Sequence, residues 1–225
     1  MAAGAEGVPG LCGVAERSET PGTPPSPAAE RPRVRRQRGR FLVWSPGAAR
    51  ALRERHRVWG ALVGTPPRRG PRGGAAAGPR LPLQLRPEEA RALRESGGAT
   101  VEPVDEAEAE PSGGGAGGGA RAALATPLSR AERRSRVFRA LWGRGLHLTR
   151  GGKFGGDFLV YPGPPAQFHA CAVAQCPRSS RAQPLGALLA AARLCACVRK
   201  ALLLCAAPPE GAPSVTAITW RADLT

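Results

Sequence analysis

An acidic, glycine-rich segment interrupts the chain near its middle and limits how large any single core can be. Its first half carries five acids, Glu102, Asp105, Glu106, Glu108 and Glu110. Residues 113–119 are then glycine except for Ala116. Such a sequence buries too little apolar surface to order itself, so we interpret residues 101–127 as a linker. The 225-residue chain is therefore predicted to contain two small domains.

The N-terminal end has a different composition. Residues 1–40 are rich in proline, glycine, alanine and serine, and they end in an arginine run over residues 33–40. We interpret this stretch as a disordered basic tail. The arginine run is equally consistent with a nuclear import signal, a nucleic-acid-binding arm or a solvated tail without a partner.

Residues 41–100 show a pattern that can fold. Residues 41–44 are typical of a short buried strand, and Ser45-Pro46 then predicts an N-cap and first helical position for a helix over 46–57. Leucines alternate over residues 81–85, which predicts a half-buried strand. A second helix is expected to begin at Pro87 and to stop at Gly97-Gly98. We therefore predict a small α/β module.

Residues 128–225 predict a second domain of helices and strands. Ser129 and Glu132 have the spacing of a capping box, and the helix that follows has one apolar face. Strands are expected at 146–149, 154–161 and 168–175, then a helix at 184–194, and strands at 198–205 and 215–220. This order predicts a mixed-sheet α/β (α+β) domain.

The charge distribution restricts the chemistry that this second domain can perform. The chain carries a net charge of +16, and 31 of its 33 basic residues are arginine. Between residues 134 and 209 there are nine arginines and both lysines, but a single acid, Asp157. This balance favours RNA or an acidic partner, although it could also serve solubility alone. Metal-dependent nucleases need clustered carboxylates, so we expect no metal and no cofactor here.

RNA can be cleaved without a metal because its 2′-hydroxyl can attack the adjacent phosphorus. The reaction needs a base, an acid and a cation beside the phosphorus. The only tyrosine, Tyr161, together with His169 and Lys200, supplies these three chemical types near the ends of predicted strands. His169 is expected on the strand 168–175, on the same face as Cys171 and Val173. Each of the three also has a structural interpretation, as a rim tyrosine, a core histidine or a solvated lysine.

Targeting signals and cysteine usage indicate the compartment. The longest apolar stretch, residues 185–207, is interrupted by three basic residues, and the N-terminus lacks the apolar region of a secretory signal. The six cysteines are therefore expected to be reduced, in the cytosol or nucleus. A zinc site is the alternative, but no CxxC pair is present.

The segment Lys153–Gly163, KFGGDFLVYPG, is followed by Phe168-His169 and by Val198-Arg199-Lys200. These motifs resemble the signature of the tRNA intron endonuclease family. The similarity runs from about residue 134 to residue 220 and is greatest to the eukaryotic catalytic subunits that cut the 3′ splice site. It extends to the small N-terminal module over residues 41–53 and 81–93.

The resemblance implies a restriction-endonuclease-like catalytic domain and metal-independent cleavage of precursor tRNA to a 2′,3′-cyclic phosphate and a 5′-hydroxyl. It makes Tyr161 the general base, His169 the general acid and Lys200 the stabiliser of the transition state, although the first two roles could be exchanged. Arg193 and Trp220 match positions that grip a base at the splice site. A guanidinium and an indole are suited to stacking on a flipped-out base.

The family also implies partners and a compartment. We expect a nuclear heterotetramer that contains a second catalytic subunit and two structural subunits. Two alternatives remain at this point: a catalytically silent RNA-binding or assembly subunit of the same complex, and a general RNA chaperone.

Overall fold

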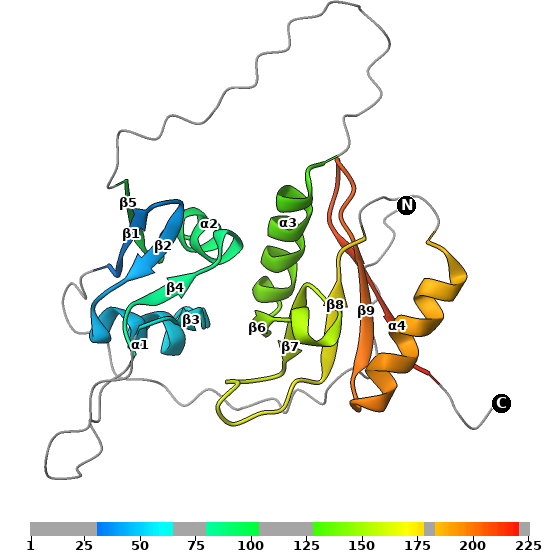
Figure 1. The fold of residues 1–225 in the computed structure, drawn as a ribbon. Helices are drawn as coiled ribbons and strands as arrows, with labels where there is room; N and C mark the ends of the chain where they lie inside the picture. The colour runs from blue at the N-terminus through cyan, green and yellow to red at the C-terminus, as the bar shows by residue number, and fades with distance from the viewer. Residues whose placement is uncertain (1–30, 65–79, 104–127, 178–182, 221–225) are drawn as a thin grey trace, which may run out of the picture.

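Two five-stranded sheets account for most of the computed structural model, which describes residues 31–64, 80–103, 128–177 and 183–220 (Figure 1). The first sheet consists of β1 Arg33–Gln37, β2 Arg40–Val43, β3 Ala61–Leu62, β4 Leu83–Leu85 and β5 Thr100–Pro103. Its order is β3-β4-β2-β1-β5, with β1 and β5 parallel and the other pairs antiparallel. Helices α1 Pro46–Glu54 and α2 Pro87–Glu95 pack on one face of this sheet.

Strand β1 corrects the expectation that residues 1–40 form a disordered tail. Val34 in the middle of the arginine run is fully buried, and the strand pairs with β2 on one side and β5 on the other. Strand β5 likewise uses residues that we had assigned to the linker. Both errors have one cause: a short strand is stabilised by neighbours distant in sequence, which local composition does not reveal. Residues 1–30 and 104–127 lie outside the described residues.

The predicted helix starts agree with the structure. The Ser45 side chain accepts a hydrogen bond from the Ala48 backbone N–H at 3.3 Å, and Pro46 is the first residue of α1. Helix α3, Arg130–Gly143, begins in the same way, because the Ser129 hydroxyl accepts from the Glu132 N–H at 3.1 Å. Side-chain acceptors at an N-cap satisfy donors that the helix leaves unpaired, which makes these positions predictable from sequence.

The second sheet has the order β10-β9-β8-β7-β6. Its elements are β6 His147–Arg150, the 3-10 turn η1 Gly152–Phe154, β7 Phe158–Tyr161, β8 Ala172–Gln175, β9 Ala201–Ala206 and β10 Ser214–Ile218. Only β8 and β9 run parallel, joined by helix α4 Leu185–Cys197. Helix α3 packs on one face and α4 on the other, which gives the mixed α/β domain that the sequence predicted (Figure 1).

The turn before β7 is longer than expected and delays the strand by four residues. Gly155 has a φ of +72°, a left-handed conformation that glycine adopts without steric cost. A Cβ atom on Gly156 would lie 2.3 Å from Val173 Cγ1 and 2.9 Å from the Ala174 carbonyl oxygen. The two glycines of the KFGGD motif therefore form a tight turn that packs against β8.

The N-terminal domain docks on the free edge of the second sheet and on α3. Val58 forms a parallel β-bridge with Leu148 of β6. Nearby, the Trp59 indole N–H donates to His147 Nδ1 at 2.8 Å. The Trp142 indole N–H of α3 donates to the His56 carbonyl oxygen at 2.8 Å. The two domains thus share specific polar contacts, and α2 lies beside α3 (Figure 1).

Candidate active site

The register of three adjacent strands brings Tyr161 and Lys200 to the same edge of the second sheet, the one formed by the C-terminal end of β7 and the N-terminal ends of β8 and β9. Val160 pairs with Ala172, and Ala172 pairs with Ala201. Tyr161 directly follows Val160, and Lys200 directly precedes Ala201. Because β7 is antiparallel to β8 and β9 is parallel to it, both residues emerge at the same edge. One strand separates them, so their Cα atoms are about 10 Å apart.

Both side chains also lie on the same face of the sheet. Side chains alternate along a strand, so Tyr161 shares a face with Leu159, and Lys200 shares a face with Leu202. Leu159 and Leu202 belong to the core under α4, and Tyr161 packs against that core. Both site residues are half-buried. The phenol and the ammonium therefore project from a rigid, packed base.

His169 reaches the same edge from a loop, which corrects the prediction that it lies on a strand. Strand β8 begins three residues later, at Ala172, and the His169 side chain is exposed. The loop before it is nevertheless packed. The Phe168 ring covers Gly163 so closely that a Cβ atom there would lie 2.5 Å from the ring, and Ala170 is buried. The expected face sharing of His169 with Cys171 and Val173 is therefore wrong, and its role beside Tyr161 and Lys200 stays a prediction.

A left-handed turn at the end of α4 sets the position of Lys200. Arg199 has a φ of +54°, and the Lys200 backbone N–H donates to the Cys195 carbonyl oxygen at 2.9 Å. The Lys200 ammonium donates to the Val198 carbonyl oxygen at 3.2 Å. It also lies 5.4 Å from the centroid of the Phe154 ring, within the range of a cation–π contact. Phe154 thus helps to hold the ammonium in place.

Two contacts of the site are not predicted from the sequence. The first is the contact of the Phe154 ring with the Lys200 ammonium. Phe154 belongs to the signature segment, so its motif position could have indicated a role beside Lys200. The other is Thr149 of β6, whose hydroxyl lies 3.3 Å from the Tyr161 hydroxyl. Nothing in the sequence singles out Thr149, because only the pairing of β6 with β7 brings it near Tyr161.

For the RNA cleavage that the family resemblance implies, replacing Phe154 with leucine is expected to lower the rate about threefold to thirtyfold, because it removes the aromatic face from the Lys200 ammonium. Phe154→Tyr keeps a ring and is expected to stay within about twofold of the wild type. Single-turnover cleavage of the substrate that the resemblance implies, a precursor tRNA, measures both. Equal rates for the two variants would show that the ring does not position Lys200.

The two residues matched to base gripping are also brought together. The Arg193 guanidinium carbon lies 5.5 Å from the centroid of the Trp220 ring. Arg193 is exposed on α4, while Trp220 is half-buried just beyond β10. A base could enter between the two groups only if they move apart. Their role in gripping RNA stays a prediction.

Asp157 is the single acid between residues 134 and 209, and it lies at the opposite end of β7 from Tyr161. One of its oxygens is 2.8 Å from an Arg134 nitrogen and 3.2 Å from Arg130. Its other oxygen accepts from the Cys176 backbone N–H at 2.9 Å. Asp157 therefore serves a structural network that ties β7 to α3 and to the end of β8.

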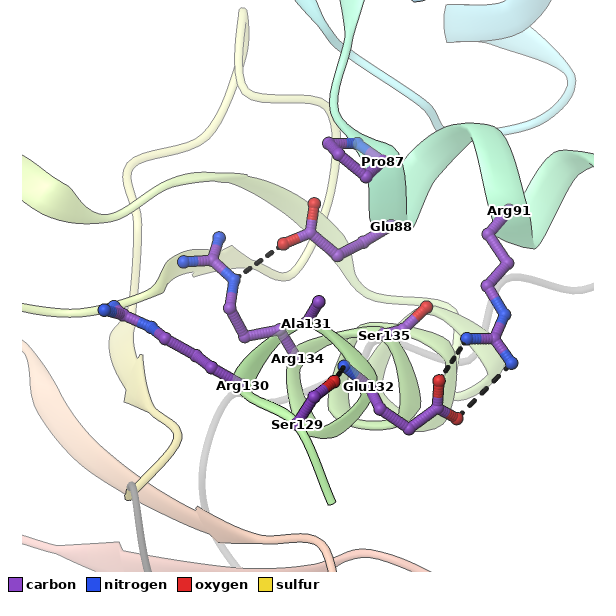
Figure 2. Close-up of a pocket in the computed structure, with 9 residues that line it drawn as sticks. All are labelled: Pro87, Glu88, Arg91, Ser129, Arg130, Ala131, Glu132, Arg134 and Ser135. Carbon is purple, nitrogen blue, oxygen red and sulfur yellow. Dashed lines mark hydrogen bonds and ion pairs between the residues drawn. The ribbon is translucent and has the colours of Figure 1, made fainter. Parts of the chain in front are cut away.

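A pocket of about 450 Å³ lies near the Asp157 end of β7, between α2 and the first turn of α3 (Figure 2). Its lining charges are paired: Arg134 Nε lies 2.6 Å from a Glu88 oxygen and Arg91 contacts Glu132, while Arg130 pairs with Asp157 outside the pocket. The pocket is thus a neutralised part of the domain interface. It does not contain the tyrosine, histidine or lysine of the candidate site.

The other two histidines have structural surroundings. Burial, and secondarily the nearby Arg57, lowers the pKa of His147 below its ordinary value. Burial, and secondarily Arg55, lowers the pKa of His56. Since His147 Nδ1 accepts the Trp59 indole hydrogen bond, its neutral form is the one that fits the domain interface. His169 alone of the three is presented to solvent at the sheet edge.

Four of the described cysteines, Cys176, Cys195, Cys197 and Cys205, are free thiols. Burial raises the pKa of Cys205 to about 12, and burial with the neighbouring Asp157 raises the pKa of Cys176. These thiols are thus held protonated and unreactive. Among the helices that the structure describes, none is long and apolar enough to cross a membrane.

Comparisons with known proteins agree with the motif. Residues 32–104 match the family model of the TSEN34-like N-terminal domain, and residues 131–220 match that of the tRNA intron endonuclease catalytic C-terminal domain. Over 89 residues the chain is 51% identical to the tRNA-splicing endonuclease subunit Sen34 of Homo sapiens. It is 49% identical over 89 residues to the Sen34 subunit of Mus musculus.

The aligned segment covers 40% of this chain and spans 29% and 28% of the length of these two relatives. The N-terminal match begins at residue 32, so it includes β1, which we had assigned to the tail. Residues 131–220 therefore belong to the tRNA intron endonuclease family as its catalytic C-terminal domain, and residues 32–104 are a TSEN34-like N-terminal domain.

Proposed function

We propose that this chain is a catalytic subunit of a tRNA-splicing endonuclease that cuts precursor tRNA at the 3′ splice site. The proposal is supported by the placement of Tyr161 and Lys200 at one sheet edge, with His169 in the loop that leads into β8 at that edge, within a domain that matches the catalytic domain of the family. These three groups supply a base, an acid and a cation at the rim of a packed sheet.

The reaction follows from these groups. Tyr161, as the phenolate, accepts the proton of the ribose 2′-hydroxyl and becomes the neutral phenol, and the 2′-oxygen attacks the adjacent phosphorus. The bond from phosphorus to the 5′-oxygen breaks, and the His169 imidazolium donates a proton to that oxygen. The Lys200 ammonium lies beside the negative charge that develops on the non-bridging oxygens. The products are a 2′,3′-cyclic phosphate and a 5′-hydroxyl.

The proposal extends to the assembly. The relatives are named as subunits of a tRNA-splicing endonuclease. We therefore propose a heterotetramer of this chain with a second catalytic subunit and two structural subunits, which native mass spectrometry of the purified complex tests. The same proposal places the complex in the nucleus, which imaging of the tagged chain tests.

Cleavage of an intron-containing precursor by the assembled complex is expected to proceed at an unchanged rate in excess EDTA. The chemistry proposed here needs only the three side chains. The 5′ fragment should resist a phosphatase until the cyclic phosphate is opened, and the 3′ fragment should accept phosphate from a polynucleotide kinase. Loss of the 3′ cut in EDTA would refute the metal-free mechanism. A complex that binds precursor RNA, but whose cleavage does not change when Tyr161, His169 or Lys200 is substituted, would instead fit a silent assembly subunit.

A further inference from the structure

Helices α1 and α2 cover only one face of the N-terminal sheet, and the opposite face is basic. Val34 and Val43 point toward the helices and are fully buried. Arg35 and Leu42 lie opposite each other on β1 and β2, next to these valines, so they point to the other face. The Arg35 side chain is 53% exposed. That face of the sheet is therefore open to solvent there.

Arginines concentrate along the β1–β2 hairpin. Arg38 lies in its turn, with a φ of +47°, and Arg40 begins β2, two residues from Leu42 on the same face. Both are exposed. Within the described part of the chain, the acid beside this row is Glu102, which is 3.7 Å from Arg35 and 35% exposed itself. Exposed pairs of this kind contribute little, so Arg35 can exchange Glu102 for a stronger anionic partner.

An aromatic side chain accompanies the arginines. Trp44 directly follows β2, two residues after Leu42, and is 52% exposed. A single exposed apolar residue needs no explanation. A tryptophan beside a row of arginines, however, is the combination that binds RNA, because guanidinium groups hold phosphates while the indole stacks on a base.

We propose that the surface formed by Arg35, Arg38, Arg40, Leu42 and Trp44, the arginine face, is a second RNA-contact surface. It binds a part of the precursor tRNA that lies outside the proposed cleavage site at Tyr161, His169 and Lys200. The inference rests on the proposed function, since it takes the same RNA as its ligand. Charge complementarity favours RNA, because the exposed positions carry guanidinium groups and an indole. A surface of this kind binds the phosphate backbone without reading its sequence.

The test uses the assembled complex with the full chain carrying Arg35→Gln, Arg38→Gln and Arg40→Gln together. Equilibrium binding of precursor tRNA is measured over a series of salt concentrations. Affinity at low salt is expected to fall at least about tenfold. The negative slope of log affinity against log salt is expected to become shallower by about 2. Glutamine keeps most of the side-chain length, so the sheet is expected to remain intact.

A matched control removes the same charge from the helical side of the domain. Arg50, Arg55 and Arg94 are exposed on or at the ends of α1 and α2. Their combined replacement with glutamine is expected to change the affinity less than about threefold and to keep the slope. A further variant, Trp44→Leu, is expected to weaken binding while leaving the slope unchanged, because stacking releases no counterions.

The outcomes separate this inference from the function on which it rests. If the wild-type complex does not bind precursor tRNA, both fail. If the wild type binds and the arginine variant matches its control, the arginine face does not hold RNA. If the arginine variant fails to assemble, the face binds a protein subunit, and the inference is overturned.

Discussion

Replacing Glu89 with alanine is expected to lower the free energy of unfolding by about 3–5 kcal/mol, because it leaves a buried charge without its partner. Glu89 is fully buried at the start of α2. One of its oxygens accepts from the Arg86 guanidinium at 3.0 Å and from the Gly60 N–H at 3.3 Å. The other accepts from the Arg86 backbone N–H at 2.8 Å.

Arg86 has no good alternative to Glu89. Its guanidinium carbon lies 5.5 Å and 5.2 Å from the centroids of the Phe138 and Phe158 rings of the catalytic domain. Its side chain is only 11% exposed. The Arg86–Glu89 pair therefore lies in the interface between the two domains, and the loss of either partner is expected to loosen that interface as well as α2.

Denaturant unfolding measures this effect, and Glu95→Ala on the same helix is the matched control. Glu95 pairs with Arg91 at 2.9 Å but is 29% exposed, so its loss is expected to cost less than about 1 kcal/mol. The double variant Arg86→Leu/Glu89→Leu is expected to recover much of the loss, because it removes both charges. If Glu89→Ala cost no more than Glu95→Ala, the buried pair would not stabilise the interface.

Replacing Lys200 with alanine is expected to lower the rate of 3′-site cleavage about 10²- to 10³-fold, because it removes the cation that the proposed mechanism places beside the phosphorus. Tyr161→Phe and His169→Ala are each expected to lower the rate about 10²- to 10⁴-fold. Lys200→Arg should restore little, because a planar guanidinium does not replace a compact ammonium. Single-turnover rates with saturating complex measure these effects.

The sequence supplies its own control for this series. Lys153 is the only other lysine of the chain, and it is exposed on the turn η1 inside the same signature segment. The Lys153→Ala complex is expected to cleave within about threefold of the wild-type rate, since a surface charge outside the site has only a weak, screened effect. Equal losses for the two lysines would indicate a general effect of charge rather than a role of Lys200 at the phosphorus.

Local features of the fold were readable from the sequence. Ser45 and Ser129 cap the helices they were expected to cap, because capping depends on neighbours within three residues. The arrangement of the sheets was less accessible. β1 and β5 pair with each other although more than sixty residues separate them, and an arginine-rich strand has no apolar alternation to reveal it.

The candidate site shows the same division. Rarity and motif single out Tyr161, His169 and Lys200 as candidates, and strand pairing places Tyr161 and Lys200 at one edge. The position of His169 on a strand was wrong, because Phe168 folds back over Gly163 and keeps the chain in a loop. The contacts of Thr149 and Phe154 depend on how η1 and β6 lie against the site, which no single segment specifies.

The most direct test of the central claim is the cleavage rate of a precursor tRNA in which sulfur replaces the 5′-bridging oxygen at the 3′ splice site. A thiolate leaves without protonation, so it does not need a general acid. If His169 protonates the leaving oxygen, this substrate is expected to restore most of the rate lost by His169→Ala and none of that lost by Tyr161→Phe. Rescue of the Tyr161→Phe complex alone would show that Tyr161 is the acid and His169 the base. Rescue of neither complex would contradict the assignment of an acid and a base to this sheet edge.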